Sequence, residues 1–375
     1  MKKLKEKKII SIILTGGGTG GHIYPALAVA EVLKKDPKIF GISYIGCGKN
    51  LEKDIVTGEG IDFHSINVSG MPRKFGLKLL TWLTELLTAT VKSHSLLLEL
   101  KPDVVFGTGG YVTAPVLIAA LLLKIPYVIH DPDAHPGIVN KFMAKGAKCV
   151  SLAFEQAKDF IKTPNTVVYG NPVRGCLAAV SKEEAISELG LDSERKTALA
   201  IGGSQGAKSI NDAMMDAIPI LVNKYGFQII HQTGRKNFDE YTEKFYAKYP
   251  DFKGNPGYIV KPYFDNISLP LNAADVAISR AGSLSISELN LCGLPSILIP
   301  YPYAAADHQR FNALAMENTG AAICLEDDYC NSGRIIELID YILENPEKMK
   351  RANKILAKPD SAENIVKELK SVAIK

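Results

Sequence analysis

Several features that would place this sequence in other classes of protein are missing from it. Its six cysteines include no Cys-x-x-Cys pair and no zinc-ligand spacing, which argues against a disulfide framework and indicates reduced, cytosolic thiols. It has no cluster of basic and aromatic residues of the kind that binds nucleic acid, and its net charge of +4 is small for 375 residues. We therefore expect no nucleic-acid partner.

Long hydrophobic runs are also missing. The run from Ala114 to Leu123 stops at Lys124, well short of the roughly 20 residues that a spanning helix needs. The lysine-rich start and the apolar residues Ile9 to Leu14 imitate a signal peptide, but that run is too short and leads into glycines without a small-residue cleavage site. We expect a basic leader followed by the first strand, and no segment that crosses a membrane.

The sequence does contain a repeated alternation of short apolar strands, turns and helices. This alternation predicts an α/β fold with parallel sheets covered by helices. The expected strands are Ile9–Thr15, Ile42–Gly46, Val104–Gly107, Tyr127–His130 and Lys148–Ser151, then Thr197–Ile201, Phe227–Gln232, Tyr258–Val260, Val276–Ser279 and Ser296–Ile299.

Each half of the chain opens with a strand that runs into a glycine-rich turn. The first turn is Gly16 to Gly21, followed by His22, and the second is Gly202 to Ala207. After the first turn, we expect a helix that starts near Tyr24 and Pro25. The duplication predicts two Rossmann-like lobes, residues 1–165 and 166–345, with a C-terminal helix, residues 346–375, that packs back on the first lobe. A glycine turn at a helix N-terminus suits a phosphate or a diphosphate.

The first turn also satisfies the dinucleotide fingerprint, as Gly16-x-Gly18-x-x-Gly21. A nicotinamide site needs an acid at the end of the second strand to hold the ribose hydroxyls. That strand ends in Gly46-Cys47-Gly48-Lys49-Asn50, without an acid. Two glycine turns fit a diphosphate-linked donor held between two lobes better than they fit a redox cofactor.

Five motifs occur in an order that makes a family resemblance specific. They are Thr15 to His22, Gly107 to Pro115, Gly170 to Arg174, Gly202 to Ala207, and Ser287-Glu288-Leu289 with Gly293-Leu294-Pro295. Together they resemble the MurG family of bacterial N-acetylglucosaminyltransferases, glycosyltransferase family 28, over nearly the whole chain. The resemblance implies a GT-B fold, in which the parallel sheets of two Rossmann-like lobes face a central cleft.

The resemblance also implies an activity. It is an inverting transfer of N-acetylglucosamine from UDP-N-acetylglucosamine to the C4 hydroxyl of the muramoyl sugar of lipid I, an undecaprenyl-diphosphoryl-N-acetylmuramoyl-pentapeptide, which gives lipid II. No metal cofactor would be held by the protein, and the enzyme would lie on the cytoplasmic face of the cell membrane as a peripheral protein of peptidoglycan synthesis, where other cell-wall proteins could join it. Three alternatives stay open: a UDP-N-acetylglucosamine 2-epimerase, a diacylglycerol glycosyltransferase, and a non-catalytic UDP-sugar-binding regulator.

His22 is the candidate general base. It follows the glycines at a helix N-terminus, where the positive end of the helix dipole favours a neutral ring that can accept a proton. Its alternative role is a hydrogen bond to the loop or to a phosphate. The resemblance places the acceptor diphosphate at Gly18, Gly109, Gly110 and Tyr111, where a second helix N-terminus opens in this lobe.

The resemblance assigns donor binding to residues of both lobes. They are Thr19, Gly20, Gly21, Asp133, Arg174, Ser204, Phe264, Ser283, Leu284, Ser285, Ile286, Ser287, Glu288 and Gln309. Structural alternatives stand beside three of them: Ser204 as a helix N-cap, Phe264 as a packing residue, and Glu288 as the closing residue of a capping box with Ser285. In the functional interpretation, Glu288 accepts the two ribose hydroxyls and Arg174 clamps the diphosphate.

One motif departs from the family pattern. Where the family usually carries His-Glu-Gln-Asn, this sequence has His130-Asp131-Pro132-Asp133. The acid at Asp133 replaces an amide that could both donate and accept a hydrogen bond. Asp131 and Asp133 also form an Asp-x-Asp pattern that could hold a divalent cation. However, the two glycine turns and Arg174 can already stabilise the negative charge of the diphosphate.

A lipid acceptor predicts a contact with an anionic membrane surface. Cationic and apolar side chains alternate before the first acid of this region, Glu85. The candidate patch consists of Arg73, Lys74, Phe75, Lys78, Leu79, Trp82 and Leu83. The alternative is an ordinary helix that buries its apolar side in the first lobe.

Overall fold

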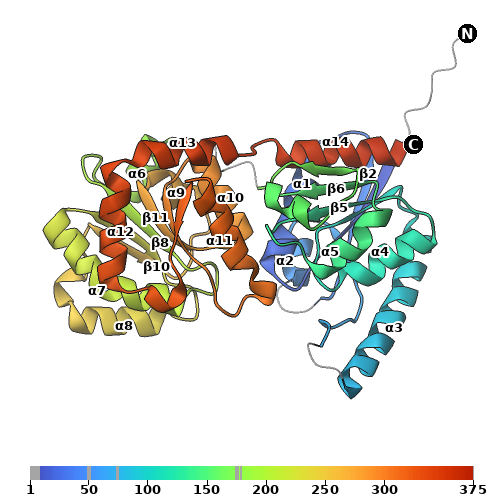
Figure 1. The fold of residues 1–375 in the computed structure, drawn as a ribbon, viewed down its shortest axis with the longest axis horizontal. Helices are drawn as coiled ribbons and strands as arrows, with labels where there is room; N and C mark the ends of the chain where they lie inside the picture. Colours follow the sequence, from blue (N-terminus) through green and yellow to red (C-terminus); the bar gives the residue numbers. More distant parts are fainter. Residues whose placement is uncertain (1–8, 49–51, 73–75, 174–176, 178–179, 375) are drawn as a thin grey trace, which may run out of the picture. The chain divides into compact units, whose positions relative to one another are not determined.

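The computed structural model describes residues 9–48, 52–72, 76–173, 177 and 180–374. The chain divides into two compact units, Met1–Arg174 with Pro359–Lys375, and Gly175–Lys358 (Figure 1). Each unit is a parallel sheet covered by helices on both faces.

The first unit contains a seven-stranded sheet in the order β3-β2-β1-β4-β5-β6-β7. Its elements are β1 (Ile10–Thr15), α1 (Gly20–Lys34), β2 (Ile39–Gly46), α2 (Glu52–Gly58), β3 (Asp62–Ser65), α3 (Leu77–Leu100), β4 (Val104–Gly107), α4 (Thr113–Leu122), β5 (Tyr127–Asp131), α5 (Ile138–Met143), β6 (Cys149–Leu152), β7 (Thr166–Val168) and α14 (Ser361–Ile374).

The second unit contains a six-stranded sheet in the order β10-β9-β8-β11-β12-β13. Its elements are α6 (Lys182–Leu189), β8 (Thr197–Ile201), α7 (Lys208–Tyr225), β9 (Gln228–Gln232), α8 (Phe238–Lys248), β10 (Tyr258–Lys261), α9 (Ser268–Ala273), β11 (Val276–Arg280), α10 (Ser283–Cys292), β12 (Ser296–Ile299), α11 (His308–Asn318), β13 (Ala322–Cys324), α12 (Ser332–Glu344) and α13 (Pro346–Leu356).

The cores explain why these segments fold as they do. The central strands are apolar on both faces, as β-branched runs must be when helices cover both sides of a parallel sheet. In the first unit, α1 and α14 bury their apolar sides on one face of the sheet, and α3 and α4 pack on the other. In the second unit, Ile335, Leu338, Ile339 and Ile342 form the buried stripe of α12, at the spacing of one helix face.

All ten expected strands are present, and three further short strands lie at the sheet edges. These are β3, β7 and β13, each three or four residues long. An edge strand pairs on one side only and can be half exposed, so β3 and β7 lack the buried apolar run that identified the others.

The boundary between the units differs from the predicted one at residue 165. The strand β7 pairs with β6 and belongs to the first sheet. The predicted C-terminal helix is two helices: α13 packs on α10 in the second unit, and α14 packs on α1 in the first. The break falls at Pro359, which cannot continue a helix that precedes it.

Candidate functional site

In the first unit, the candidate residues gather where the strand order reverses. The strand β1 pairs with β2 on one side and with β4 on the other, so the loops that follow β1 and β4 leave the same edge of the sheet side by side. Ligands of open α/β sheets bind at such switch points, outside the carboxyl ends of the strands.

The two loops touch through their backbones, and this contact explains the glycines. A Cβ on Gly110, which has φ +81°, would lie 2.2 Å from the Gly17 carbonyl oxygen. A Cβ on Gly16 would lie 2.0 Å from Thr108 Oγ1. Gly18, with φ +88°, packs against the ring of Tyr111. The structure therefore brings Gly18, Gly109, Gly110 and Tyr111 together.

The helix α1 begins earlier than the sequence predicts. We expected a start near Tyr24 and Pro25, but the backbone N–H groups of His22 and Ile23 already donate to the Thr19 carbonyl, and the helix starts at Gly20. Thr19 is the N-cap residue, and neither a side-chain cap nor an acid is present in the first turn. The unpaired N–H groups and the positive dipole end of α1 are thus directed toward the loops that follow β1 and β4, as an anion site requires.

His22 lies in the first turn of α1, half buried. Its Nδ1–H donates to the Thr108 carbonyl oxygen at 2.9 Å, and Thr108 Oγ1 donates to the His22 carbonyl oxygen at 2.6 Å. A neutral ring held in this tautomer carries its lone pair on Nε2. The arrangement suits a proton acceptor, and the sequence did not single out Thr108 as the residue that orients it.

The Asp-x-Asp segment has an internal structural role. Asp131 is buried, and its carboxylate accepts hydrogen bonds from Asn140 Nδ2 at 2.8 Å, from Gly137 N at 3.0 Å and from Asp133 N at 3.1 Å. Burial raises its pKa to about 7. These three hydrogen bonds give Asp131 a role in holding its own segment against α5, and the metal-ligand alternative stays a prediction. Within the described residues, no group of three or more His, Cys, Asp or Glu side chains could hold a metal ion.

A buried histidine, His130, stabilises the Asp131-Pro132-Asp133 segment through Asn171. His130 Nε2–H donates to Asn171 Oδ1 at 2.9 Å, and Asn171 Nδ2 donates to the Pro132 carbonyl at 3.2 Å. Burial lowers the pKa of His130 to about 4, so this ring is neutral. The Gly170-Asn171-Pro172 turn thereby holds the loop that carries Asp133, a role that the motif alone did not indicate.

The second unit repeats the arrangement. The strand β8 pairs with β9 and β11, so its order also reverses beside a glycine loop, Gly202 to Ala207. The helix α7 follows at Lys208 with Ala207 as N-cap and no side-chain cap. Ser204 lies three residues before that N-cap, exposed, so its alternative role as the helix cap is wrong.

Close backbone packing again requires glycine. Gly206 has φ +76°, and a Cβ there would lie 2.0 Å from the Thr233 carbonyl oxygen. Asn237 Nδ2 donates to the carbonyls of Gln205 and Thr233, and Gln232 Nε2 donates to the Gly203 carbonyl at 3.2 Å. Residues at and after the end of β9 thus hold the Gly202–Ala207 loop through both their side chains and their backbone.

Substitution of Gly206 tests this packing against backbone strain alone. We expect Gly206→Ala to destabilise the protein by about 2 to 4 kcal/mol, since it combines a positive φ with a steric clash. The matched control, Gly226→Ala, has φ +71° with nothing within 4 Å of its Cβ and should cost about 1 kcal/mol. Thermal unfolding measures both. Equal losses would contradict the clash.

The helix α10 settles one alternative for Glu288. It begins at Ser283 with Gly282 as N-cap, so Ser285 lies inside the helix and the predicted capping box does not exist. Glu288 lies in the second turn, half buried, and burial raises its pKa to about 7. Of the preceding candidates, Ser283 and Ile286 are buried, and Leu284, Ser285 and Ser287 are half buried. The Ile286 side chain packs inside the unit, and its backbone N–H donates to the Gly282 carbonyl at 3.0 Å.

Two further candidates, Gln309 and Phe264, form hydrogen bonds with residues of neighbouring segments. Gln309, in the first turn of α11, accepts a hydrogen bond from Tyr301 N at 2.9 Å through its Oε1. The Phe264 side chain is buried, 5% exposed, as its packing alternative requires. The Phe264 backbone N–H donates to Gln232 Oε1 at 2.9 Å, so Gln232 links it to the Gly203 carbonyl.

Arg280, at the end of β11, is a residue that the sequence analysis missed. Its Nη1 donates to the carbonyls of Ile299 and Pro300, each at 3.2 Å, and pairs with Asp327 at 2.5 Å. Its guanidinium lies 5.5 Å from the centroid of the Tyr301 ring. Arg280 therefore fixes the turn whose Tyr301 N–H orients Gln309.

The predicted membrane patch is described only in part. Arg174 of the donor set and Arg73, Lys74 and Phe75 of the patch lie outside the described residues. Lys78 and Leu83 are exposed on α3, whereas Leu79 and Trp82 are half buried, and Trp82 Nε1–H donates to the Ser69 carbonyl at 3.0 Å. The hydrogen bond of Trp82 fits the packing alternative for that residue, and the membrane contact stays a prediction. Among the described helices, none combines the length and the apolar character that a membrane span needs.

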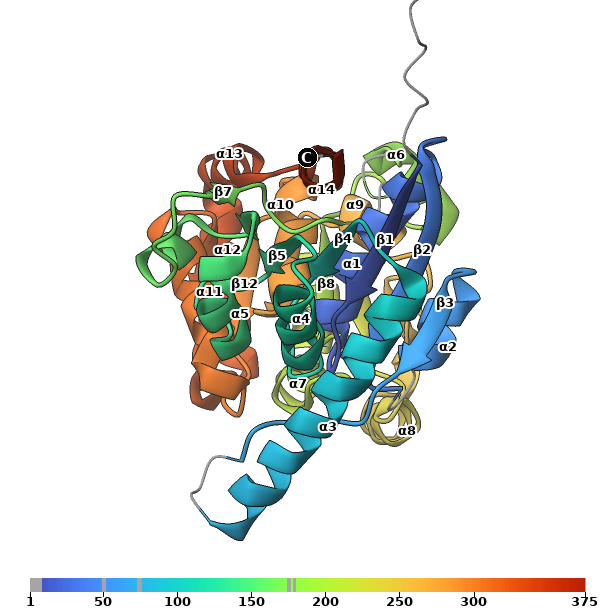
Figure 2. The ribbon, with the colours of Figure 1, turned by 90° about the vertical axis from the view of Figure 1, so that its right-hand side faces the viewer.

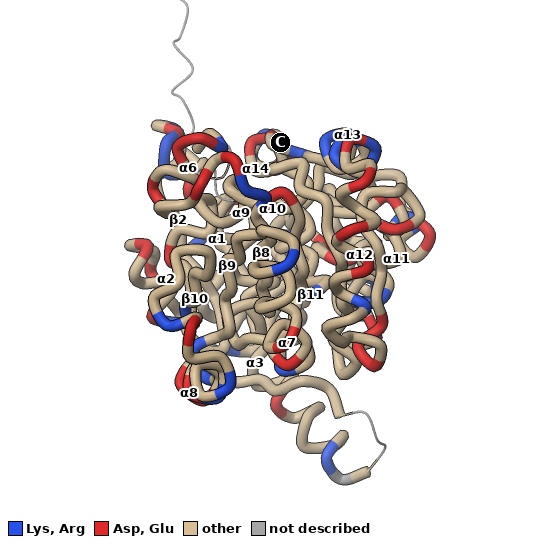
Figure 3. Tube along the Cα trace, turned by 90° about the vertical axis from the view of Figure 1, so that its left-hand side faces the viewer, with Lys and Arg blue, Asp and Glu red and all other residues tan. Residues whose placement is uncertain are grey.

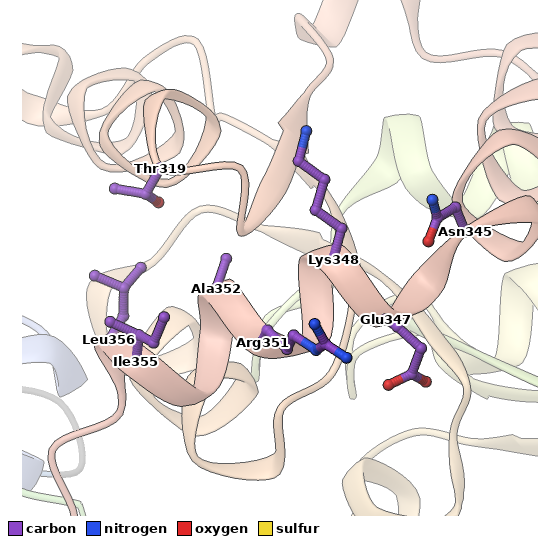
Figure 4. A pocket seen from close by; sticks show the side chains of 8 residues that line it. All are labelled: Thr319, Asn345, Glu347, Lys348, Arg351, Ala352, Ile355 and Leu356. Carbon is purple, nitrogen blue, oxygen red and sulfur yellow. The ribbon is translucent and has the colours of Figure 1, made fainter.

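A pocket of the second unit lies away from these residues. It has a volume of 580 Å³ and is lined by side chains of α13 and its neighbours, among them Lys348, Arg351 and Ile355 (Figure 4). Thr319, the C-cap residue of α11, lines it too. Figure 3 marks the lysines and the arginine of α13. None of the candidate residues contributes to this pocket.

Two Rossmann-like units, each with a glycine loop and a helix N-terminus at a switch point, give the chain the architecture of the GT-B fold of glycosyltransferases. Family models agree: the glycosyltransferase family 28 N-terminal domain matches residues 12–152, and the family 28 C-terminal domain matches residues 197–369. The chain belongs to glycosyltransferase family 28, with the MurG enzymes.

Individual relatives match over nearly their full length. The chain is 38% identical over 370 residues to the UDP-N-acetylglucosamine--N-acetylmuramyl-(pentapeptide) pyrophosphoryl-undecaprenol N-acetylglucosamine transferase of Halothermothrix orenii, covering 97% of this chain and 99% of the relative. The transferase of the same name from Bacillus licheniformis is 38% identical, with 96% and 98% covered.

Solved structures show the same fold. The crystal structure of Acinetobacter baumannii MurG superimposes with a TM-score of 0.74 at 25% identity and covers 96% of this chain and 99% of that chain. The UDP-GlcNAc 2-epimerase of Neisseria meningitidis, bound to UDP-GlcNAc, gives 0.65 at 15% identity, with 96% and 99% covered. At this low identity, the second structure shows only that an epimerase has the same fold as this chain.

Proposed function

We propose that the chain transfers N-acetylglucosamine from UDP-N-acetylglucosamine to the C4 hydroxyl of the muramoyl sugar of lipid I, forming lipid II with inversion at the anomeric carbon. The observation that carries this proposal is the 38% identity over 97% of the chain with a transferase of that name. The oriented His22 and the two glycine loops supply chemistry that such a transfer needs.

In the proposed mechanism, the acceptor oxygen attacks the anomeric carbon of the donor in line with the leaving group. The bond between that carbon and the UDP oxygen breaks, and UDP leaves with the electron pair. His22 Nε2 takes the hydroxyl proton, since Nδ1–H is already given to Thr108. Ser204, the amides of the Gly202–Ala207 loop and Arg174 stabilise the departing diphosphate, and Glu288 holds the ribose hydroxyls.

We further propose that the protein works as a peripheral protein on the cytoplasmic face of the cell membrane. The support is the alternation of apolar and cationic residues in the sequence from residue 73 to residue 83, of which Lys78 and Leu83 are exposed in the first turns of α3. Flotation with vesicles that contain phosphatidylglycerol measures this contact, and equal binding to neutral vesicles would remove the electrostatic part of the argument.

A transfer assay tests the central proposal. With radiolabelled UDP-N-acetylglucosamine and lipid I, we expect a labelled lipid product, and we expect a chelator to leave the rate unchanged. Diacylglycerol in place of lipid I should give no product, and omission of any lipid should give no epimerised sugar. If the folded protein binds the donor but yields no labelled lipid, the transferase assignment is wrong and the regulator alternative is favoured. Strong inhibition by the chelator would show that the transfer depends on a metal ion.

A further inference from the structure

A buried carboxylate lies against the first glycine turn. It belongs to Glu52, the first residue of α2, which lies beside β2 and β3 (Figure 2). Glu52 is 2% exposed. Its Oε2 accepts hydrogen bonds from Cys47 N at 3.1 Å, from Gly48 N at 3.1 Å and from Cys47 Sγ at 2.8 Å. All three donors directly follow β2, so the carboxylate is fixed at the carboxyl end of that strand.

This acid does not serve a nucleotide ribose. In dinucleotide-binding folds, an acid at the end of the second strand binds the ribose hydroxyls. The structure brings Glu52 to that point from six residues beyond Gly46, the last residue of β2. Because Glu52 is buried and its Oε2 already accepts three hydrogen bonds, a ribose does not reach it. Its role therefore lies in what it contacts inside the first unit.

The other carboxylate oxygen, Oε1, is packed between two glycines. A Cβ on Gly17 would lie 2.6 Å from Glu52 Oε1, and a Cβ on Gly46 would lie 2.4 Å from it. Gly17 does not have a positive φ, so the close packing of Glu52 and Val112 requires a glycine there, and not the backbone conformation. Glu52 thus limits the position of Gly17 by direct contact.

A chain of hydrogen bonds connects Glu52 to Tyr111. The Cys47 thiol donates to Glu52 Oε2 at 2.8 Å, and the Tyr111 hydroxyl donates to Cys47 Sγ at 3.8 Å. The Tyr111 ring packs on Gly18, where a Cβ would lie 3.0 Å from Cε1 of the ring. Since an ionised carboxylate only accepts hydrogen bonds, the chain runs in one direction and keeps the Tyr111 hydroxyl turned toward the buried Cys47.

Glu52 therefore holds two successive glycines of the turn. It packs on Gly17 directly, and it reaches Gly18 through the thiol of Cys47 and the ring of Tyr111. A backbone that binds an anion through its N–H groups is most effective when it is held in shape beforehand, because ordering it on binding costs affinity.

The residues after Gly18 have other supports. The Thr19 carbonyl accepts the first hydrogen bonds of α1, and the imidazole of His22 is oriented by Thr108, which directly follows β4. Neither contact involves Glu52. A change at Glu52 should consequently act on the glycine turn and leave the proton acceptor in place.

We propose that Glu52 is a positioning residue of the acceptor site. Through its contacts with Gly17 and with the Cys47 thiol, it holds the Gly16–Gly18 turn in the shape that receives the diphosphate of the acceptor lipid. The proposal rests on the proposed function, because it takes this turn as the diphosphate site of lipid I. Glu52 itself touches no substrate, so its effect passes through the backbone of the turn.

Steady-state kinetics with lipid I and UDP-N-acetylglucosamine test this role. Cys47→Ala removes the link to Tyr111, and Glu52→Ala also removes the packing on Gly17, so the KM for lipid I should rise by about 5-fold and about 20-fold, respectively. The turnover number and the donor KM should change by less than about twofold. Cys149→Ala, a buried cysteine of β6, is the matched control and should leave the KM for lipid I unchanged. Circular dichroism melting verifies that each variant is folded.

Two further variants separate positioning from a general loss of structure. Cys47→Ser keeps a hydroxyl that donates to Glu52 and accepts from Tyr111, so the KM for lipid I should return to within about twofold of the wild-type value. Tyr111→Phe breaks the same chain at its other link, so the double variant Cys47→Ala/Tyr111→Phe should raise this KM no further than the larger of the two single effects. Additive effects, a failure of serine to rescue, or a parallel loss of turnover and donor binding would overturn the proposal.

Direct binding distinguishes a failure of this proposal from a failure of the proposed function. If the wild-type protein forms no labelled lipid, the transfer assignment is wrong, but calorimetric binding of lipid I in detergent micelles still tests the turn. Weaker binding by Cys47→Ala than by the wild type and Cys47→Ser then supports the positioning role. Equal affinities of the three proteins, or no binding of lipid I by the wild type, would refute it.

Discussion

Replacement of His22 by alanine should lower the turnover number by about 10³-fold, because a positioned general base contributes typically 10² to 10⁴ to the rate. The donor affinity should change by less than about twofold, since the backbone of the Gly16–Gly21 turn is set by glycine contacts and not by the imidazole. Single-turnover transfer to lipid I and calorimetric binding of UDP-N-acetylglucosamine measure the two quantities separately.

His22→Gln sharpens the same test. The glutamine amide can still donate a hydrogen bond to the Thr108 carbonyl, as Nδ1–H of the histidine does, but it offers no basic nitrogen. A loss of turnover as large as that of His22→Ala would support the proton acceptor, whereas recovery of most of the rate would show that His22 only holds the loop. His64→Ala in β3, at the sheet edge, is the matched histidine control and should leave turnover near the wild-type value.

Replacement of Glu288 by alanine should raise the donor KM by about 100-fold, because a carboxylate that accepts two hydroxyls contributes roughly 1.5 to 3 kcal/mol for each hydrogen bond. The turnover number at saturating donor should fall much less, since the ribose lies away from the reacting carbon. Steady-state kinetics with UDP-N-acetylglucosamine measures both. Glu363→Gln on α14, an exposed glutamate of the other unit, is the matched control.

The pH dependence of donor binding has a definite sign. Burial raises the pKa of Glu288 to about 7, so in the free protein this group is largely neutral below that pH and charged above it. Since the carboxylate is the form that accepts both hydroxyls, donor affinity should rise as the pH rises through 7, and Glu288→Gln should flatten this dependence. An unchanged profile in that variant would assign the titration to another group.

The same shift affects stability in the opposite direction. A carboxyl group whose folded pKa lies above its ordinary value of 4.5 destabilises the folded state progressively as the pH rises from 4.5 through 7. We therefore expect Glu288→Gln to gain stability relative to the wild type at pH 8 but not at pH 4. Such a gain also shows that its weaker donor binding is not the result of poor folding.

Much of the fold could be predicted from local pattern. Nine of the ten predicted strands lie inside a sheet and were predictable because a strand buried on both faces must be largely apolar along its length. The tenth, β10, is an edge strand that the apolar residues Tyr258 to Val260 still identified. The edge strands β3, β7 and β13 were not, since a strand paired on one side can carry polar and exposed residues. The start of α1 was misplaced because Pro25 looks like a first helical residue, whereas the Thr19 carbonyl begins the helix five residues earlier.

The candidate site also contains residues that the sequence identifies and residues that only the structure reveals. Residues that form motifs, such as His22, Ser204 and Glu288, could be named from the sequence. The residues that support them could not be named. Thr108 orients His22 from the neighbouring strand, and Arg280 fixes the turn that holds Gln309. Asn171 accepts a hydrogen bond from His130 and donates to the Pro132 carbonyl beside Asp133.

By itself, the sequence determined the class of fold, the duplication and the two glycine loops, because these follow from apolar periodicity and from residue types that only certain backbones accept. Only the tertiary structure decided why each glycine is needed, which ring nitrogen of His22 carries the lone pair, and that Ser285 and Glu288 form no capping box. These depend on contacts between segments that lie far apart in the chain, and no local pattern records them.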